Sequence, residues 1–323
     1  PAHRDLEAEL ADLYDVESCL VFVSGHATNV SLIAALMGPK DLIVHDALAH
    51  NSIVVGAELS RAQRRIFSHN DLEALEQILE SSRSRAERCL IVSEGLFSMD
   101  GDGPDLARLV EIKERWGAWL MIDEAHALGV LGSTGRGIAE MAGVDPRRVD
   151  IWMGTLSKTL CGCGGYIAGS HALIEYVKYQ ASGMVYSVGL PVPIAVASLT
   201  ALRLMKAEPE LVARLQANGR HFLDRAKTAG LDTGTSWGAA VSPVIVGDSL
   251  RTVMLAERLL HKGINAFPII PPGVPEKSAR LRFFFSADHS ATDIERAVEL
   301  TAGELACLVE DGVSVTNLSA SLK

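Results

Sequence analysis

One stretch decides the fold that the sequence predicts: Gly154-Thr155-Leu156-Ser157-Lys158-Thr159-Leu160-Cys161-Gly162-Cys163-Gly164-Gly165-Tyr166-Ile167-Ala168-Gly169. Lys158 stands among small and hydroxyl residues, and a glycine-rich turn and an apolar strand follow it. This pattern is typical of a lysine that holds a carbonyl cofactor as a Schiff base, with Thr155 and Ser157 available to bind a phosphate. An ordinary surface lysine before a glycine-rich loop has the same local sequence, so the rest of the chain must decide.

The chain has 323 residues, of which 48% are hydrophobic, and its formal net charge is -10. Such a chain can bury a large core and is long enough for one large and one small domain. Nucleic acids and anionic membranes attract basic surfaces, so the acidic balance argues against both as partners. The stretch most similar to a membrane span, Val185 to Leu202, is interrupted by Gly189, Pro191 and Pro193, so no membrane-spanning segment is predicted.

The five cysteines are odd in number and scattered along the chain, a distribution that indicates a reducing compartment and hence a cytoplasmic protein. Cys161 and Cys163 lie closer together than the cysteines of a CxxC metal or redox pair. We interpret them as small side chains in a tight turn. The aspartate-glycine pairs from Asp100 to Gly103 lack the spacing and the terminal glutamate of a calcium loop, so no metal is predicted.

Apolar strands and helices alternate through the first half of the chain. Because the strands are apolar throughout, the alternation predicts an α/β fold with a mainly parallel sheet covered by helices on both faces. Ligands of such sheets bind beyond the carboxyl ends of the strands. The predicted strands comprise residues 19–23, 41–44, 89–93, 119–122, 150–153 and 166–169, and the predicted helices comprise residues 4–13, 30–37, 70–81 and 105–116.

Polar residues follow most of these strands, where a ligand is expected. The turn at Gly25 and His26 leads from a strand toward a helix, an arrangement that binds anions, although a plain capped turn has the same sequence. His50 can stack on a flat ring or cap a helix. Asp123 follows four apolar residues and needs a partner, either a protonated ring nitrogen or an arginine. The residues predicted to meet at one site are Gly25, His26, His50, Glu94, Asp123, His126 and Lys158.

The sequence changes in character near Pro209, which predicts a large domain over residues 1–208 and a small α+β domain over residues 209–323. In the small domain, a strand places Arg280 and Arg282 on one face and Leu281 on the other. One arginine can bind a carboxylate bidentately, unless both are simply exposed. The predicted elements are helices over 209–229, 249–262 and 292–308, strands over 241–246 and 281–286, a proline-rich loop over 268–275 and a serine-rich tail or linker over 313–323.

Four motifs in this chain resemble those of one enzyme family. They are Ser93-Glu94-Gly95-Leu96-Phe97-Ser98-Met99-Asp100-Gly101-Asp102, Asp123-Glu124-Ala125-His126 with the glycines up to Gly137, Gly154-Thr155-Leu156-Ser157-Lys158, and Ser286-Ala287-Asp288-His289. The chain resembles the α-oxoamine synthases over nearly its whole length. These are pyridoxal-phosphate enzymes of fold type I, and they include 8-amino-7-oxononanoate synthase, 2-amino-3-ketobutyrate CoA ligase, 5-aminolevulinate synthase and serine palmitoyltransferase.

The resemblance implies a role in cofactor binding for most of the candidates. Lys158 would form the Schiff base, Asp123 would pair with the pyridinium nitrogen, and His50 would stack on the ring. Glu94, Ser98 and His126 would line the cofactor, the latter two toward its phenolic oxygen. The residues implied to hold the phosphate are Gly25 and His26, through their amides, with Thr155 and Ser157.

Two further roles concern the substrate and the assembly. Ser187 matches a hydroxyl position that the family contributes across a homodimer interface. Arg280 or Arg282 would bind the carboxylate of the amino-acid substrate, and the sequence analysis favours Arg280. The family has a longer N-terminal segment, and this chain starts at Pro1 without a methionine, so we expect an excised piece of a longer protein.

The resemblance implies that the protein condenses an amino acid with an acyl thioester, either an acyl-CoA or an acyl-carrier protein, and releases carbon dioxide. The product would be an α-amino ketone. Two alternatives remain open at this point: another fold-type-I reaction, such as that of an aldolase or an aminotransferase, and a noncatalytic partner subunit. The presence of both Lys158 and Asp123 argues against the second alternative.

Overall fold

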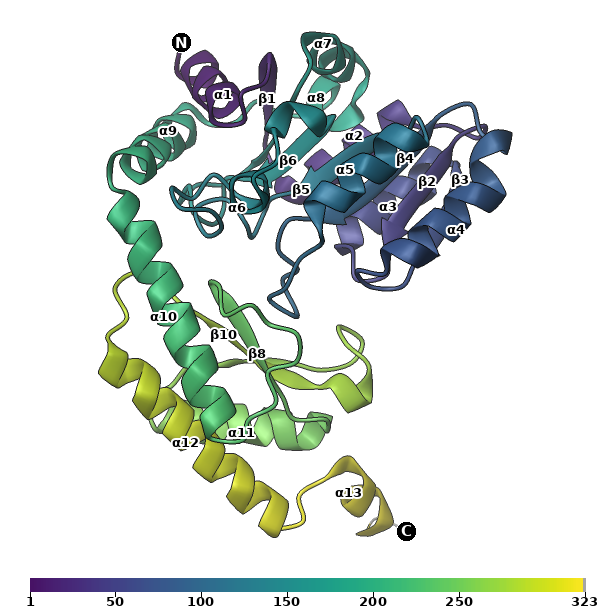
Figure 1. Ribbon diagram of the computed structural model, residues 1–323. Coiled ribbons are helices and arrows are strands. Elements are labelled where there is room, and N and C mark those ends of the chain that lie inside the picture. The colour runs from purple at the N-terminus through teal and green to yellow at the C-terminus, as the bar shows by residue number, and fades with distance from the viewer. Residues whose placement is uncertain (322–323) are drawn as a thin grey trace. The chain divides into compact units, whose positions relative to one another are not determined.

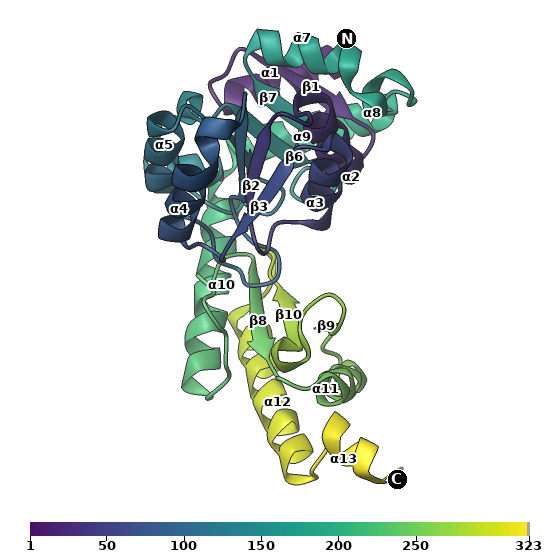
Figure 2. The ribbon, with the colours of Figure 1, turned by 90° about the vertical axis from the view of Figure 1, so that its right-hand side faces the viewer.

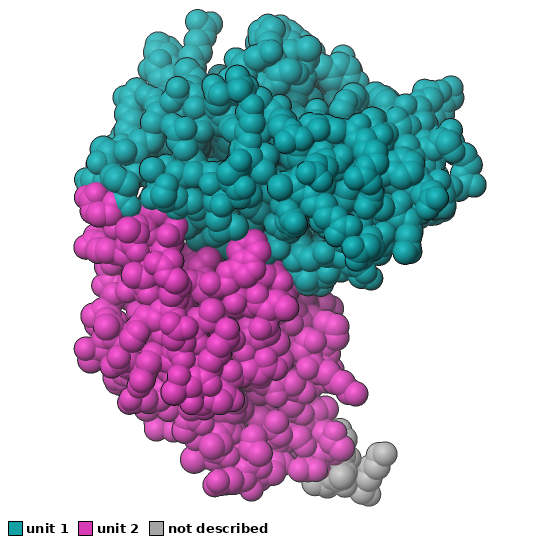
Figure 3. Space-filling view, viewed as in Figure 1, with its two compact units in different colours: residues 1–97, 103–209 teal, residues 98–102, 210–323 magenta. Residues whose placement is uncertain are grey.

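The computed structural model describes residues 1–321 and divides into two compact units (Figure 3). Unit 1 comprises residues 1–97 and 103–209, and unit 2 comprises residues 98–102 and the chain from Glu210 onward. The predicted large domain over residues 1–208 included residues 98–102. They belong to unit 2 because its residues bind them: Trp237 N donates a hydrogen bond of 2.9 Å to Gly101 O.

Unit 1 is built on a seven-stranded sheet with the order β1-β7-β6-β5-β4-β2-β3 (Figure 1). The strands from β3 to β6 run parallel, and β7 runs antiparallel to both of its neighbours. The predicted α/β class with a mainly parallel sheet is therefore confirmed. The strands are β1 (Ser18–Phe22), β2 (Leu42–Asp46), β3 (Gln63–Phe67), β4 (Cys89–Glu94), β5 (Trp119–Asp123), β6 (Ile151–Thr155) and β7 (Gly165–Gly169).

Helices cover both faces of this sheet. Figure 2 places α2 and α3 on one face and α4 and α5 on the other. The spacing of Leu72, Leu75 and Leu79 explains how α4 packs, because all three leucines lie buried on one side of the helix. The helices of unit 1 are α1 (Ala2–Leu13), α2 (Gly25–Leu36), α3 (Asn51–Ser60), α4 (Leu72–Ser82), α5 (Leu106–Arg115), α6 (Ile138–Ala142), α7 (His171–Gln180), α8 (Ser182–Val185) and α9 (Val192–Ala207).

The start of α2 differs from the prediction. The helix begins at Gly25 rather than near Val30, because Ser24 caps it and its Oγ accepts a hydrogen bond from Ala27 N. The polar residues between Gly25 and Val30 therefore belong to the helix and not to a turn. This correction places the first turn of α2, with its free backbone N–H groups, at the carboxyl edge of the sheet.

Unit 2 contains a three-stranded antiparallel sheet of order β8-β10-β9, with helices packed on it. Its core includes Phe222 from α10, Leu255 from α11 and Leu281 from β10. Leu281 is fully buried, so the predicted alternation along this strand places it in the core. The elements are α10 (Pro209–Thr228), β8 (Val241–Ile245), α11 (Ser249–His261), β9 (Phe267–Ile269), β10 (Arg280–Phe284), α12 (Ala291–Glu310) and α13 (Val315–Ser321).

Two predictions for unit 2 were wrong in detail. The proline-rich loop contains the short strand β9, which pairs with β10. The segment predicted as a tail contains α13, because Ser314 Oγ accepts a hydrogen bond from Asn317 N at 3.1 Å and Asp248 accepts one from Val315 N at 2.9 Å. Among the described helices of the chain, none has the length and apolar character that crossing a bilayer requires.

Candidate active site

A cavity of 270 Å³ lies at the carboxyl edge of the sheet in unit 1. The parallel strands β4, β5 and β6 end there at Glu94, Asp123 and Thr155. The cavity is lined by Ser24, Gly25, His26, Asn29, His50, Ser52, Glu94, Asp123, Ala125, His126, Met153, Thr155, Ser157, Lys158, Cys163 and Gly164. The structure thus brings together the predicted positions Gly25, His26, His50, Glu94, Asp123, His126, Thr155, Ser157 and Lys158.

Asp123 is buried and is held by neutral donors. Its Oδ2 accepts a hydrogen bond from Asn29 Nδ2, and its Oδ1 accepts one from Ala125 N, each at 2.9 Å. An arginine was one of the two predicted partners of Asp123, whereas both of these hydrogen bonds come from uncharged groups. Asn29 also donates to Ser52 Oγ at 2.9 Å, so one amide fixes two residues of the cavity wall. The donors that hold the Asp123 carboxylate in these bonds are therefore uncharged.

The sequence analysis missed Asn29. It lies one helical turn after Gly25, on the same side of α2, and that spacing would have indicated it if the helix had been predicted to start at Gly25. Its Oδ1 is buried without a hydrogen-bond partner in the described part of the chain. Ser52, Cys163 and Gly164 are further lining residues that the motifs did not indicate as binding positions.

Glu94 and His50 form one wall of the cavity. Glu94 Oε1 accepts a hydrogen bond of 2.6 Å from His50 N. Burial, and then the negative charge of Asp123, raise the pKa of the Glu94 carboxyl well above its usual range. Burial lowers the pKa of the His50 imidazole, whose Nδ1 accepts a hydrogen bond from Ser52 N at 3.2 Å. Both pKa shifts favour the uncharged forms of these side chains.

The start of α2 and the end of β6 form an anion-binding corner. A Cβ on Gly25 would lie 3.1 Å from Thr155 Oγ1, so the backbone of α2 approaches this hydroxyl closely. Thr155 Oγ1 lies 2.8 Å from Ser157 Oγ. Free N–H groups of a helix N-terminus beside two hydroxyls are a suitable site for a phosphate.

Lys158 lies in a hydrogen-bonded turn after β6. Within this turn, Gly162 N donates to Leu156 O at 2.7 Å and Cys161 N donates to Lys158 O at 3.0 Å. Cys161 has a φ of 49° and both cysteines are free thiols, as expected for residues that shape a tight turn. Cys163 also lines the cavity. In the described residues, no group of three or more His, Cys, Asp and Glu is arranged to hold a metal ion.

The other predicted site residues lie outside this cavity. Ser187 is exposed in the connection between α8 and α9. Ser98, Arg280 and Arg282 belong to unit 2.

The two arginines of β10 differ in their contacts. Arg280 NH1 forms a 2.7 Å ion pair with Asp100 Oδ1 and donates to Met99 O at 3.0 Å. Arg282 NH1 donates to Ser98 O at 3.2 Å, and Arg282 Nε is buried without a hydrogen-bond partner among the described residues. Burial lowers the pKa of Arg282. The guanidinium of Arg280 is therefore paired with a carboxylate, whereas that of Arg282 donates to a carbonyl oxygen.

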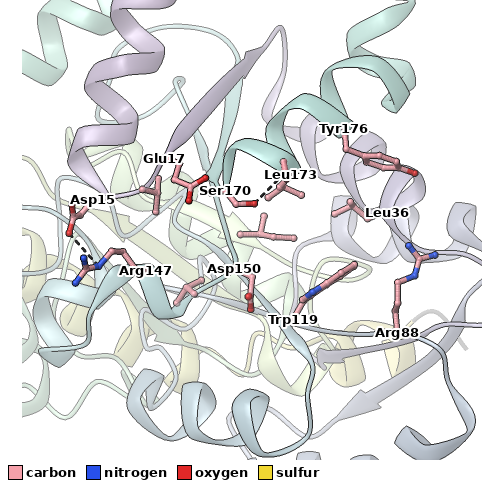
Figure 4. Close-up of a pocket in the computed structure, with 15 residues that line it drawn as sticks. Asp15, Glu17, Leu36, Arg88, Trp119, Arg147, Asp150, Ser170, Leu173 and Tyr176 are labelled. Atoms are coloured by element: carbon pink, nitrogen blue, oxygen red, sulfur yellow. Dashed lines mark hydrogen bonds and ion pairs between the residues drawn. The ribbon is translucent and has the colours of Figure 1, made fainter.

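A second and larger cavity, of 740 Å³, lies at the opposite edge of the sheet in unit 1 (Figure 4). Its charged residues form ion pairs with protein groups: Arg88 with Asp41 at 2.8 Å, and Asp150 with Lys113 at 3.0 Å. Trp119 forms part of the wall and is 37% exposed. Size alone would favour this cavity, but two of its charged residues, Arg88 and Asp150, are already paired within the protein.

The family model described as aminotransferase class I and II matches residues 1–300. A curated 8-amino-7-oxononanoate synthase from Geotalea daltonii is 44% identical over 302 residues, which cover 93% of this chain and 76% of the relative.

The solved structures that are similar to this chain include two serine palmitoyltransferases. The serine palmitoyltransferase of Sphingomonas wittichii has a TM-score of 0.89 and 30% identity, covering 94% of this chain and 76% of that one. A serine palmitoyltransferase variant of S. paucimobilis with bound PLP-myriocin has a TM-score of 0.89 and 28% identity, with the same coverage of both chains.

Proposed function

The chain belongs to the aminotransferase class I and II family and, within it, to the pyridoxal-phosphate-dependent α-oxoamine synthases, and from this premise we propose that it condenses an amino acid with an acyl thioester. The thiol and carbon dioxide leave, and an α-amino ketone is formed. One observation carries the proposal: Lys158, the buried Asp123 and the anion-binding corner at Thr155 line a single cavity.

The cavity residues fit pyridoxal phosphate. Asp123 is a buried carboxylate held by Asn29 and Ala125 N, both uncharged, so a protonated ring nitrogen supplies the charge that its neighbours lack. The phosphate is assigned to the amides at Gly25 and His26 and to the hydroxyls of Thr155 and Ser157. When bound, the cofactor withdraws electrons from the α-carbon of an attached amino acid and so makes its proton acidic.

The chain's own residues then have distinct tasks. Lys158 holds the cofactor through its amine and, once released, takes the proton from the α-carbon. His50, whose imidazole pKa is lowered by burial, is assigned to the face of the ring. Glu94, whose carboxyl pKa is raised by burial, lines the cavity together with Asp123. His126 and Ser98 are assigned to the phenolic oxygen.

The substrate carboxylate is assigned to Arg282. Its Nε lacks a partner in the described residues, whereas the guanidinium of Arg280 is paired with Asp100. An arginine with a free edge can bind a carboxylate bidentately, which fixes the orientation of the α-carbon as well as its position. The carboxylate of a bound amino acid would also supply the negative charge that is missing from the surroundings of the half-buried Arg282 guanidinium.

We also propose that two copies of the chain assemble as a homodimer. The connection that carries Ser187 exposes large apolar side chains, with Tyr186 at 88% and Val188 at 80% exposure. A second copy would cover these side chains and bring the Ser187 hydroxyl to its partner's site. The five free cysteines support a reducing compartment, and we propose the cytoplasm.

The experiment that tests the function measures both products at once. The protein is loaded with pyridoxal phosphate and given a panel of amino acids with an acyl-CoA or an acyl-carrier protein. We expect thiol and α-amino ketone in equal amounts, and neither with Lys158→Ala. A keto acid without released thiol would indicate an aminotransferase, an aldehyde would indicate an aldolase, and either result would overturn the proposal. The two donors distinguish a CoA thioester from a carrier-protein thioester.

A further inference from the structure

Strand β10 presents two arginines to the same side of unit 2, and only one of them is paired. Residues i and i+2 of a strand lie roughly 7 Å apart, so Arg280 and Arg282 offer similar guanidinium groups one strand repeat apart. A carboxylate bound at the first position would be displaced by that distance from one bound at the second. A substrate that must place its α-carbon accurately cannot use both positions.

Asp100 distinguishes the two arginines. Its Oδ1 lies 2.7 Å from Arg280 NH1, and the two side chains are 16% and 7% exposed. Arg280 Nε donates to Ser278 O at 2.8 Å, so the turn that precedes β10 also holds the guanidinium. Arg282 donates to the carbonyl oxygen of Ser98 and the thioether sulfur of Met99 in the same segment, and its guanidinium lies 4.7 Å from the ring centroid of Phe284, so these contacts bring no negative charge to it. Its charge is therefore left for a ligand.

The segment that carries Asp100 is itself fixed within unit 2. Thr235 Oγ1 donates to Asp102 Oδ2 at 2.5 Å, and a Cβ at Gly101, whose φ is 70°, would collide with Val241 O. Gly101 is therefore required for the close approach to β8. These contacts hold Asp100 beside β10 independently of its ion pair with Arg280.

We infer that Asp100 is a positioning residue: it occupies Arg280 and so leaves Arg282 as the arginine that receives the amino-acid carboxylate. The inference rests on the proposed function. It assigns selection of the binding position to an acidic residue that does not touch the substrate. Freeing Arg280 would let the carboxylate bind in the wrong place, and freeing Asp100 would let it compete with the substrate for Arg282.

A chemical test reports on Arg280 without any substrate or cofactor. The folded protein is treated with phenylglyoxal, and the modification of Arg280 and Arg282 is followed by mass spectrometry of peptide fragments. In Asp100→Asn, we expect Arg280 to react at least about fivefold faster than in the wild type, because the ion pair that shields it is lost. Thr235→Val is the matched control, because it loosens the same segment without freeing an arginine, and it should leave the rate at Arg280 unchanged.

A kinetic test uses a cycle of three variants in the cofactor-loaded protein. Asp100→Asn should lower kcat by about tenfold or more while the amino-acid half-saturation concentration, measured from the cofactor absorbance, changes by less than about threefold, because the carboxylate still binds but at the wrong arginine. Arg280→Gln should instead raise that concentration by about tenfold, because Asp100 becomes free to pair with Arg282. The double variant should return both values to within about threefold of the wild type.

The outcomes separate this inference from the proposed function. An unchanged rate of Arg280 modification in Asp100→Asn would overturn the inference even in a protein that makes no ketone. A double variant as impaired as the single variants would overturn it in an active protein, because neutralising Arg280 would then not be the role of Asp100. If Asp100 had only a structural role, the variants would lower thermal stability. They would not affect mainly kcat in Asp100→Asn and mainly the half-saturation concentration in Arg280→Gln. The double variant removes both charges of the Asp100–Arg280 ion pair, so neither of them is left unpaired. It therefore keeps the test valid if a single variant fails to fold.

Discussion

The two ends of the large sheet hold their charged groups in different ways. At the carboxyl edge, Asp123 is buried and accepts hydrogen bonds from the Asn29 side-chain amide and from Ala125 N. At the opposite edge, Asp41 is paired with Arg88 and Asp150 with Lys113. Neutral donors orient a carboxylate without cancelling its charge, whereas an ion pair uses that charge within the protein. The smaller cavity is therefore the one equipped for chemistry, and cavity size does not locate the site.

The largest effect is expected from Lys158→Ala. Removing the amine should abolish cofactor attachment and lower ketone formation by at least about a thousandfold, since the residue both holds the cofactor and transfers the proton. The side chain is exposed, so the thermal midpoint of the cofactor-free protein should stay unchanged. The measurements are the visible absorbance of the loaded protein and the rate of thiol release. A variant that retains the visible band would place the attachment elsewhere.

Asp123→Asn should have the second largest effect. The amide has the same shape but no charge, so it cannot keep a bound ring nitrogen protonated, and we expect kcat to fall by about a hundredfold or more. Steady-state kinetics with saturating cofactor provide the test. Asn29→Asp is an informative companion variant, because it adds charge beside Asp123 instead of removing it. Activity of Asp123→Asn within a few-fold of the wild type would contradict the assigned role.

A pH experiment extends this comparison of the two sheet ends to Glu124, which follows Asp123 in the sequence and is fully buried. Burial raises the pKa of Glu124 to about 8, from an ordinary value of 4.5. A carboxyl whose pKa is higher in the folded state stabilises the protein at low pH, and this contribution is lost as the pH rises through about 8. Between about pH 6 and pH 9 we therefore expect the free energy of unfolding to fall by about 3 kcal/mol.

Glu124→Gln tests this assignment, because the amide cannot titrate. Urea unfolding of the variant should give a difference between the two pH values that is smaller by the same amount. Ile138 N donates to Glu124 Oε1 at 3.0 Å, and an amide oxygen can accept that bond equally well. An identical pH dependence in the variant and the wild type would assign the effect to another group.

The smallest effect is expected at the other end of the sheet. Arg88→Gln removes the ion pair with Asp41, whose carboxylate still accepts hydrogen bonds from Gly38 N and Arg88 N. Because Arg88 is partly exposed, the loss should cost about 1 kcal/mol of stability and change kcat by less than about twofold. The same kinetic assay provides the measurement. A large loss of activity with an intact fold would mean that this larger cavity takes part in the reaction.

The sequence predicted the centre of the sheet well because those strands are apolar throughout. It missed β3, whose residues Gln63, Arg64 and Arg65 are polar and which has a neighbour on one side only. Such an edge strand is held by backbone hydrogen bonds, and these leave no hydrophobic pattern. The antiparallel direction of β7 was also not predicted, since an apolar strand has the same composition in either direction.

The candidate site was predictable where a residue directly follows a strand, as Glu94 and Asp123 do. Asn29 was missed because its place depends on where α2 begins, and helix ends are set by capping rather than by hydrophobic spacing. The choice between Arg280 and Arg282 was not predictable either. The two residues share a face and a chemistry, and they differ through Asp100, which lies far away in the sequence.

The segment of residues 98–102 limits how the protein can be divided by genetic means. The chain passes between the units after residues 97, 102 and 209, so unit 2 is encoded in two separate stretches of the gene. A fragment that starts at Glu210 would lack the carboxylate partner of Arg280 and the carbonyl that receives Trp237 N. Transplanting unit 2 between relatives therefore requires both stretches to be exchanged together, since either one alone arrives without the residues that complete it.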